Sequence, residues 1–167
     1  MKRRLFVLAA VAAVGAVGVG ALQAATPNAQ VPVNATKTQP VLRERNAEKL
    51  AKAAMQACAA QGFAVTVAVV DRDGVPIVVL RDEDATGATF DSALGKARAS
   101  AGFKSPSGAL GEASKTNPGL LTVPNFVILA GGEPITDPAG NMLGGIGVGG
   151  APSGDIDDGC ALAAFAS

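Results

Sequence analysis

The sequence predicts a single α+β domain, in which helices flank an antiparallel sheet of about five strands. Apolar residues recur at helical spacing in some segments and form short, valine-rich runs in others. The short runs occur in pairs joined by tight turns, and a tight turn between two strands makes them antiparallel. The expected order is helix, two strands, two helices, two or three strands and a last helix, which is typical of an α+β fold.

Four helices are expected, over residues 41–61, 89–101, 106–115 and 155–166. In the second, Lys96 and Arg98 lie on opposite flanks of the apolar stripe, so we expect both side chains to reach solvent at the edge of the core. Ser105 is expected to cap the third helix, with Pro106 at its first position. Aspartates in the first turn of the last helix should stabilise it, because negative charge interacts favourably with the positive end of the helix dipole.

The strands are expected in two hairpins. Residues 63–70 and 75–81 flank the turn from Asp71 to Gly74, and Pro76 indicates a sheet edge or a bulge. The second pair covers residues 133–136 and 141–149, and residues 126–129 form a candidate fifth strand.

The last of these strands is rich in glycine. Gly145, Gly147 and Gly149 alternate with Ile146 and Val148, so the three glycines share one face of the strand. A glycine strip in a strand indicates that a helix backbone or a flat ligand lies very close, and we favour the helix. The glycines lie within the strand and not in a turn before a helix, which excludes a dinucleotide-binding fingerprint.

The N-terminal end of the chain is typical of an exported protein. Residues 1–25 have a positive start, an apolar run and small residues before a cleavage site, as in a secretory signal peptide. Residues 26–40 are polar and proline-containing, which predicts a disordered tether before the domain of residues 41–167. We expect a periplasmic or secreted protein with no stable membrane anchor after cleavage; an uncleaved anchor and a twin-arginine signal are the alternatives.

The composition excludes several kinds of chemistry. The chain has no histidine, which removes histidine metal ligands, Ser–His and Cys–His pairs and the usual general base near neutral pH. It has no tryptophan or tyrosine and no basic patch, which argues against a nucleic-acid partner.

The two cysteines, Cys58 and Cys160, lie on the inward stripes of the first and last helices. If these helices pack on the same face of the sheet, a disulfide between them is geometrically feasible. Two buried free thiols are the alternative.

Two blocks of sequence resemble the GlcG/HbpS family, also called haem-degrading-domain or PduO C-terminal-like proteins. The first block combines the Asp71-x-x-Gly74 turn, Arg81-Asp82 and Ala93-x-x-Lys96-Ala97-Arg98. The second combines Gly131-Gly132-x-Pro134-Ile135, the run from Gly144 to Pro152, and Asp155-x-x-Asp158-x-x-Ala161. The resemblance covers about residues 42–166 and implies an antiparallel sheet flanked by helices, a tendency to form homo-oligomers and, in several members, binding of haem or a related tetrapyrrole.

This sequence differs from the family pattern at two points. Gly149 stands where a serine is common, and the missing histidine excludes histidine ligation of iron. Haem would then be held by apolar contacts and by cations at its propionates, with Met142 as a weak candidate iron ligand. The expected cofactor-binding residues are Arg81, Lys96, Arg98, Gly131, Gly132, Gly147 and Gly149.

Three functions compete on this basis. The first is an exported haem- or tetrapyrrole-binding protein without histidine ligation. The second is a periplasmic accessory protein that forms homo-oligomers or docks on an envelope protein and binds no haem. The third is a small enzyme acting on an organic acid, with Asp71 and Asp73, Asp82 and Asp84, or Lys96 as its chemical groups. The first is the function that we favour.

Overall fold

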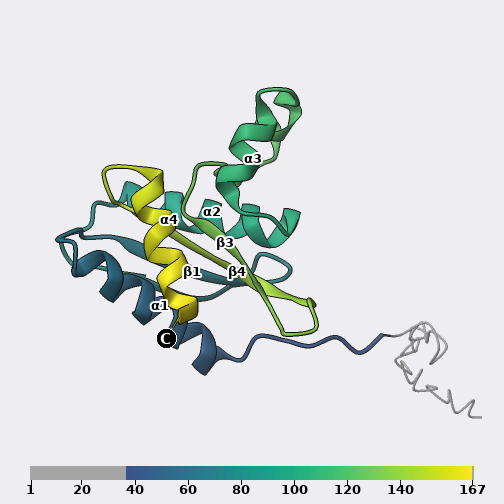
Figure 1. Cartoon of the computed structure of the whole chain (residues 1–167), viewed down its shortest axis with the longest axis horizontal. Helices are drawn as coiled ribbons and strands as arrows, with labels where there is room; N and C mark the ends of the chain where they lie inside the picture. The colour runs from purple at the N-terminus through teal and green to yellow at the C-terminus, as the bar shows by residue number, and fades with distance from the viewer. Residues whose placement is uncertain (1–36, 167) are drawn as a thin grey trace, which may run out of the picture. The chain divides into compact units, whose positions relative to one another are not determined.

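The structure is a computed structural model and describes residues 37–166. The expected signal peptide and most of the expected tether lie outside these residues. The elements in chain order are α1 (Glu44–Ala59), β1 (Thr66–Asp71), β2 (Pro76–Arg81), α2 (Ala88–Phe103), α3 (Ser107–Ser114), the 3-10 turn η2 (Pro118–Thr122), β3 (Gly132–Thr136), β4 (Met142–Gly149), α4 (Gly154–Ala163) and the 3-10 turn η3 (Ala164–Ala166) (Figure 1). Within residues 37–166, no helix is long and apolar enough to cross a membrane.

The strands form one antiparallel sheet in the order β2-β1-β4-β3. It has four strands rather than about five, because residues 126–129 pair with no strand. These apolar residues pack on helix glycines instead. A Cβ at Gly95 of α2 would lie 2.5 Å from the Val127 side chain, and one at Gly111 of α3 would lie 2.4 Å from the Ile128 carbonyl oxygen. Contact with the helices therefore takes the place of strand pairing in this segment.

The sheet lies between two helical layers. Val67 and Val69 of β1 pack with buried residues of α1 and α4, whereas Ala68 and Val70 pack with those of α2. This alternation along β1 follows from the twofold side-chain period of a strand. It places α1 and α4 on one face of the sheet and α2 on the other (Figure 1).

Helix α2 packs directly on the glycine strip of β4. This confirms the prediction that a helix backbone lies against these glycines. A Cβ at Gly145 would lie 2.4 Å from the Ala97 carbonyl oxygen, and one at Gly147 would lie 2.2 Å from that of Ala93. Such distances are far below any real Cβ contact, so only glycine lets the helix backbone approach this closely. Ile146 and Val148 point the other way, into the core beneath α1 and α4.

Cys58 of α1 and Cys160 of α4 form a disulfide, with their Cα atoms 5.5 Å apart. This confirms the bonded alternative of the two that the sequence allowed. The bridge joins residues 102 positions apart and links the two helices of one layer.

Of the two predictions made from prolines, the one at Pro76 is confirmed and the one at Pro106 is wrong. Pro76 begins β2 at an edge of the sheet, and a register shift lies between Val69 and Val70, the residue opposite it, as expected. The cap of the third helix was wrong by one residue: Pro106 is the N-cap and no side chain caps this helix. The Pro106 backbone, with φ −53° and ψ 136°, is extended and compatible with the fixed φ of proline.

Candidate functional site

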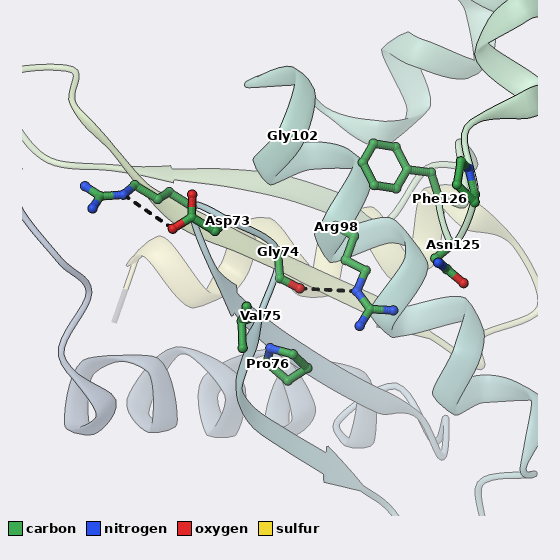
Figure 2. Close-up of a pocket in the computed structure, with 10 residues that line it drawn as sticks. Asp73, Gly74, Val75, Pro76, Arg98, Gly102, Asn125 and Phe126 are labelled. Carbon is green, nitrogen blue, oxygen red and sulfur yellow. Dashed lines mark hydrogen bonds and ion pairs between the residues drawn. The ribbon is translucent and has the colours of Figure 1, made fainter. Parts of the chain in front are cut away.

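A surface groove of about 450 Å³ lies where the β1–β2 turn faces α2 and the segment before β3 (Figure 2). Its volume falls within the roughly 300–1,000 Å³ of small-molecule sites. Its lining combines two arginines, one aspartate and several apolar side chains. The lining residues are Arg72, Asp73, Gly74, Val75, Pro76, Arg98, Gly102, Pro124, Asn125 and Phe126.

Arg98 is a half-buried cation that reaches the groove from α2. Its Nε donates a hydrogen bond to the Gly74 carbonyl oxygen at 3.2 Å (Figure 2). Gly74 can approach because its φ of +80° suits the tight turn, and the Asp71 carboxylate fixes that turn by accepting the N–H groups of Asp73 and Val75. Within the described residues the terminal nitrogens of Arg98 have no protein partner, so they can pair with an anionic ligand.

Phe126 forms the apolar wall on the other side of the groove. Its ring meets Phe103 edge-on, with centroids 5.8 Å apart, and a Cβ at Gly102 would lie 2.9 Å from it. Asn125, with a φ of 62°, turns the chain before it. Arg98, Asn125 and Phe126 also line a smaller adjoining cavity of about 330 Å³. The groove and this smaller cavity therefore adjoin at Arg98.

The other two predicted cations lie elsewhere. Arg81 is exposed at the far end of β2, about 16 Å along the strand from Pro76, and its guanidinium donates to the Ala85 carbonyl oxygen. Lys96 is only 2% exposed, so the expectation that it reaches solvent was wrong. Of the three cations predicted to meet propionates, only Arg98 lines the groove.

Lys96 is buried because it has a partner at the start of α4. Its Nζ donates to Asp157 Oδ2 at 2.7 Å and to the Val148 carbonyl oxygen at 2.9 Å. The second carboxylate oxygen of Asp157 accepts the Ala151 N–H at 3.0 Å. This buried pair ties α2, β4 and α4 together at one end of the sheet.

The predicted glycines serve packing around this pair and the sheet. A Cβ at Gly131, whose φ is +115°, would lie 2.9 Å from Lys96 Nζ, and one at Gly132 would lie 2.5 Å from the Lys96 carbonyl oxygen. The Gly132 N–H is bonded to Ser107 Oγ at 2.8 Å. Gly147 and Gly149 lie directly under α2, which leaves no open surface on that face of β4.

The residues that line the groove suit the edge and one face of haem, and none of them is a usual ligand of haem iron. The terminal nitrogens of Arg98 can meet a propionate, and Val75 and Phe126 offer apolar contact. The Arg72 guanidinium is already engaged, because it donates to the Pro40 carbonyl oxygen at 3.1 Å and lies 3.9 Å from the Asp73 carboxylate. Haem iron is usually held by histidine, cysteine, methionine or tyrosine, none of which lines the groove. Met142 packs instead beside the buried residues between the sheet and α2, and no group of metal-binding side chains occurs within residues 37–166.

A carboxyl pair lies at the same end of the sheet as Lys96. Glu133 of β3 is 8% exposed, and burial, followed by the charge and hydrogen bond of Asp158, raises its pKa to about 7. Asp158 in turn accepts the Gly131 N–H at 3.1 Å. A protonated Glu133 can therefore share its proton with Asp158, whereas two charged carboxylates would repel each other.

Because of this pair, we predict that the free energy of unfolding falls as pH rises. The unfolded chain loses the Glu133 proton near pH 4.5 and the folded chain near pH 7, so the stabilisation is complete below pH 4.5 and is lost as pH rises through that interval. Because the pair is partly solvated, we expect a loss of about 1–2 kcal/mol. Glu133→Gln should remove the loss, and urea unfolding at pH 5 and pH 8 measures it. The exposed Glu112→Gln is the control; an unchanged pH slope in Glu133→Gln would contradict the assignment.

The carboxylates considered for catalysis are turn residues. Asp71 accepts two N–H groups of its own turn, and Asp82 Oδ1 accepts the Asp84 N–H at 3.0 Å. The sequence analysis did not identify Arg72, Phe126, Glu133 or the roles of Asp157 and Asp158. One signal was present: Lys96 lies in a run of small residues that form a buried stripe, and a buried lysine requires a buried anion.

Comparison with known proteins identifies the fold and the family. The family model described as haem degrading protein HbpS-like matches residues 42–166. A crystal structure of a double mutant of HbpS from Streptomyces reticuli is 38% identical, with a TM-score of 0.78 over 86% of this chain and 97% of that one. A second structure of HbpS is 36% identical, with a TM-score of 0.78 over 83% and 97% of the two chains.

A more distant structure, described as a PduOC:haem complex, is 24% identical. Its TM-score is 0.69 over 76% of this chain and 94% of that one, which shows a shared fold. No curated protein matches the chain. From the family model and the similarity to HbpS, we conclude that the chain belongs to the HbpS-like family of haem-degrading proteins.

Proposed function

We propose that this protein is an exported haem- or tetrapyrrole-binding protein that holds its ligand in the Arg98 groove without histidine ligation. The proposal rests on the orientation of the Arg98 side chain and on its available hydrogen-bond donors. Its guanidinium is oriented by the Gly74 carbonyl and has terminal nitrogens available beside an apolar wall. This arrangement suits a planar apolar ligand that carries carboxylates at its edge.

The family and the fold support the choice of ligand. The family model is named for haem degradation, and a solved structure of the same fold is a complex with haem. In this chain Arg98 would bind a propionate, while Val75 and Phe126 would exclude water from one side of the ring. The bound iron would supply the redox and ligand-binding chemistry of haem.

The disulfide supports export. Disulfides persist in oxidising compartments and are rare in the cytosol of most organisms, so the Cys58–Cys160 bridge suits a periplasmic or secreted protein. Residues 1–25 would then be removed as a signal peptide. Assembly into homo-oligomers and docking on an envelope protein stay predictions.

A haemin titration of residues 26–167, followed at the Soret band, tests the proposed site. We expect saturable binding near one haemin per chain and an affinity about tenfold lower in Arg98→Glu, because a repulsive carboxylate replaces the cation at the propionates. Arg81→Glu is the matched control, since Arg81 is an arginine of the same family motif that lies outside the groove. Equal losses in both variants, or no saturable Soret change in the parent, would refute the proposal.

A further inference from the structure

A second and larger groove, of about 620 Å³, lies beside α1 on the side of the sheet away from α2. One wall is a face of α1 whose residues recur at helical spacing, and the rest comes from β3, β4 and the C-terminal turn. It shares no lining residue with the Arg98 groove. The lining residues are Leu42, Asn46, Lys49, Leu50, Lys52, Ala53, Gln56, Ile135, Thr136, Leu143 and Phe165.

The floor of this groove is aliphatic and continuous with the core. Leu50 and Leu143 are partly buried against the core cluster, and Ile135 belongs to it. Phe165, in the turn that follows α4, also lines the groove and is 44% exposed. An apolar chain laid here would remove these side chains from water, which is favourable in proportion to the area covered.

The charges on the rim are all of one sign. Lys49 and Lys52 are the charged residues among those that line the groove, and no carboxylate lines it. Lys52 pairs with Glu48 at 2.6 Å on the outer side of α1, whereas Lys49 has no ion pair within residues 37–166. An anionic head group would therefore meet the unpaired ammonium group of Lys49, with Lys52 beside it held in its pair with Glu48.

We propose that this groove binds a single-chain amphipathic carboxylate of the fatty-acid class. The acyl chain lies on Leu50, Leu143 and Phe165, and the carboxylate lies at Lys49 and Lys52. An aliphatic floor beside flexible ammonium groups suits one chain with one charged end, whereas the guanidinium of the Arg98 groove suits the carboxylates of a flat ring. The proposal is independent of the proposed haem site.

Displacement of a dansyl-labelled fatty acid from residues 26–167 by laurate tests the proposal. We expect saturable displacement and an affinity about tenfold lower in Lys49→Glu/Lys52→Glu, with a similar loss in Phe165→Glu. Dodecyltrimethylammonium, which has the same chain length and the opposite charge, should displace the probe at least tenfold less well. Lys115→Glu, at an exposed lysine that directly follows α3, is the control for a general change of net charge.

The haemin titration separates this site from the first. Lys49→Glu/Lys52→Glu should bind haemin as the parent does, because neither lysine lines the Arg98 groove. Absence of probe binding, equal displacement by the cationic analogue, or unchanged laurate affinity in the lysine variant would each overturn the proposal. A haemin affinity that falls with these lysines would assign the groove to haem and overturn it as well.

Discussion

Lys96→Met is expected to destabilise the folded protein by about 3–5 kcal/mol. The side chains of Lys96 and Asp157 are 3% and 5% exposed, and the variant leaves the Asp157 carboxylate buried with the Ala151 N–H as its remaining hydrogen-bond donor. Removing one member of a buried ion pair is far more harmful than removing both, because the remaining charge is desolvated without compensation. Urea unfolding at pH 7 gives the free energy of unfolding directly.

A double variant distinguishes this explanation from simple loss of packing. Lys96→Met/Asp157→Asn removes the buried charge and keeps an acceptor for the Ala151 N–H, so it should regain at least about 2 kcal/mol. Lys115→Met, in an exposed ion pair at the C-terminal end of α3, should change stability by less than about 0.5 kcal/mol. A double variant as unstable as Lys96→Met would show that the charge of Asp157 is not the cause.

Loss of the disulfide is the second large effect that we expect. Cys58→Ala/Cys160→Ala should lower the free energy of unfolding by about 4 kcal/mol, because the bridge closes a loop of 102 residues in the unfolded chain. The measurement is urea unfolding with and without dithiothreitol.

The reductant provides the control for this prediction. The parent protein should lose stability in dithiothreitol and approach the double variant, whereas the variant should not respond to it. A parent whose urea midpoint is the same with and without reductant would contradict a stabilising role for the bridge.

Much of the fold could be predicted because its signals are local. The valine-rich β1, the turn after Asp71 and the alternating glycines of β4 each specify a conformation through their immediate neighbours. The glycine strip also predicted a close neighbour on one face, and α2 occupies that place. The sequence allowed a disulfide between Cys58 and Cys160 only on the condition that their helices pack on one face of the sheet, and the structure meets that condition.

The candidate site was less predictable because it depends on contacts between distant segments. Residues 126–129 have the composition of a strand, yet helix glycines such as Gly95 give them a surface on which to pack. The helical pattern places Lys96 on the flank of its helix, where a lysine normally reaches solvent. It is buried because Asp157, 61 residues further along the chain, lies beside it in the folded protein. Only tertiary structure shows that Arg98, and not Arg81, faces a groove.

The central claim is that haem lies against Arg98, and nuclear magnetic resonance can locate it. Paramagnetic haemin broadens the amide signals of nearby residues, and diamagnetic zinc protoporphyrin serves as the matched reference. We predict that haemin selectively removes the signals of Gly74, Gly102 and Phe126, which surround the groove (Figure 2). Broadening centred instead on Leu50 and Phe165, or spread evenly over the protein, would contradict the assignment.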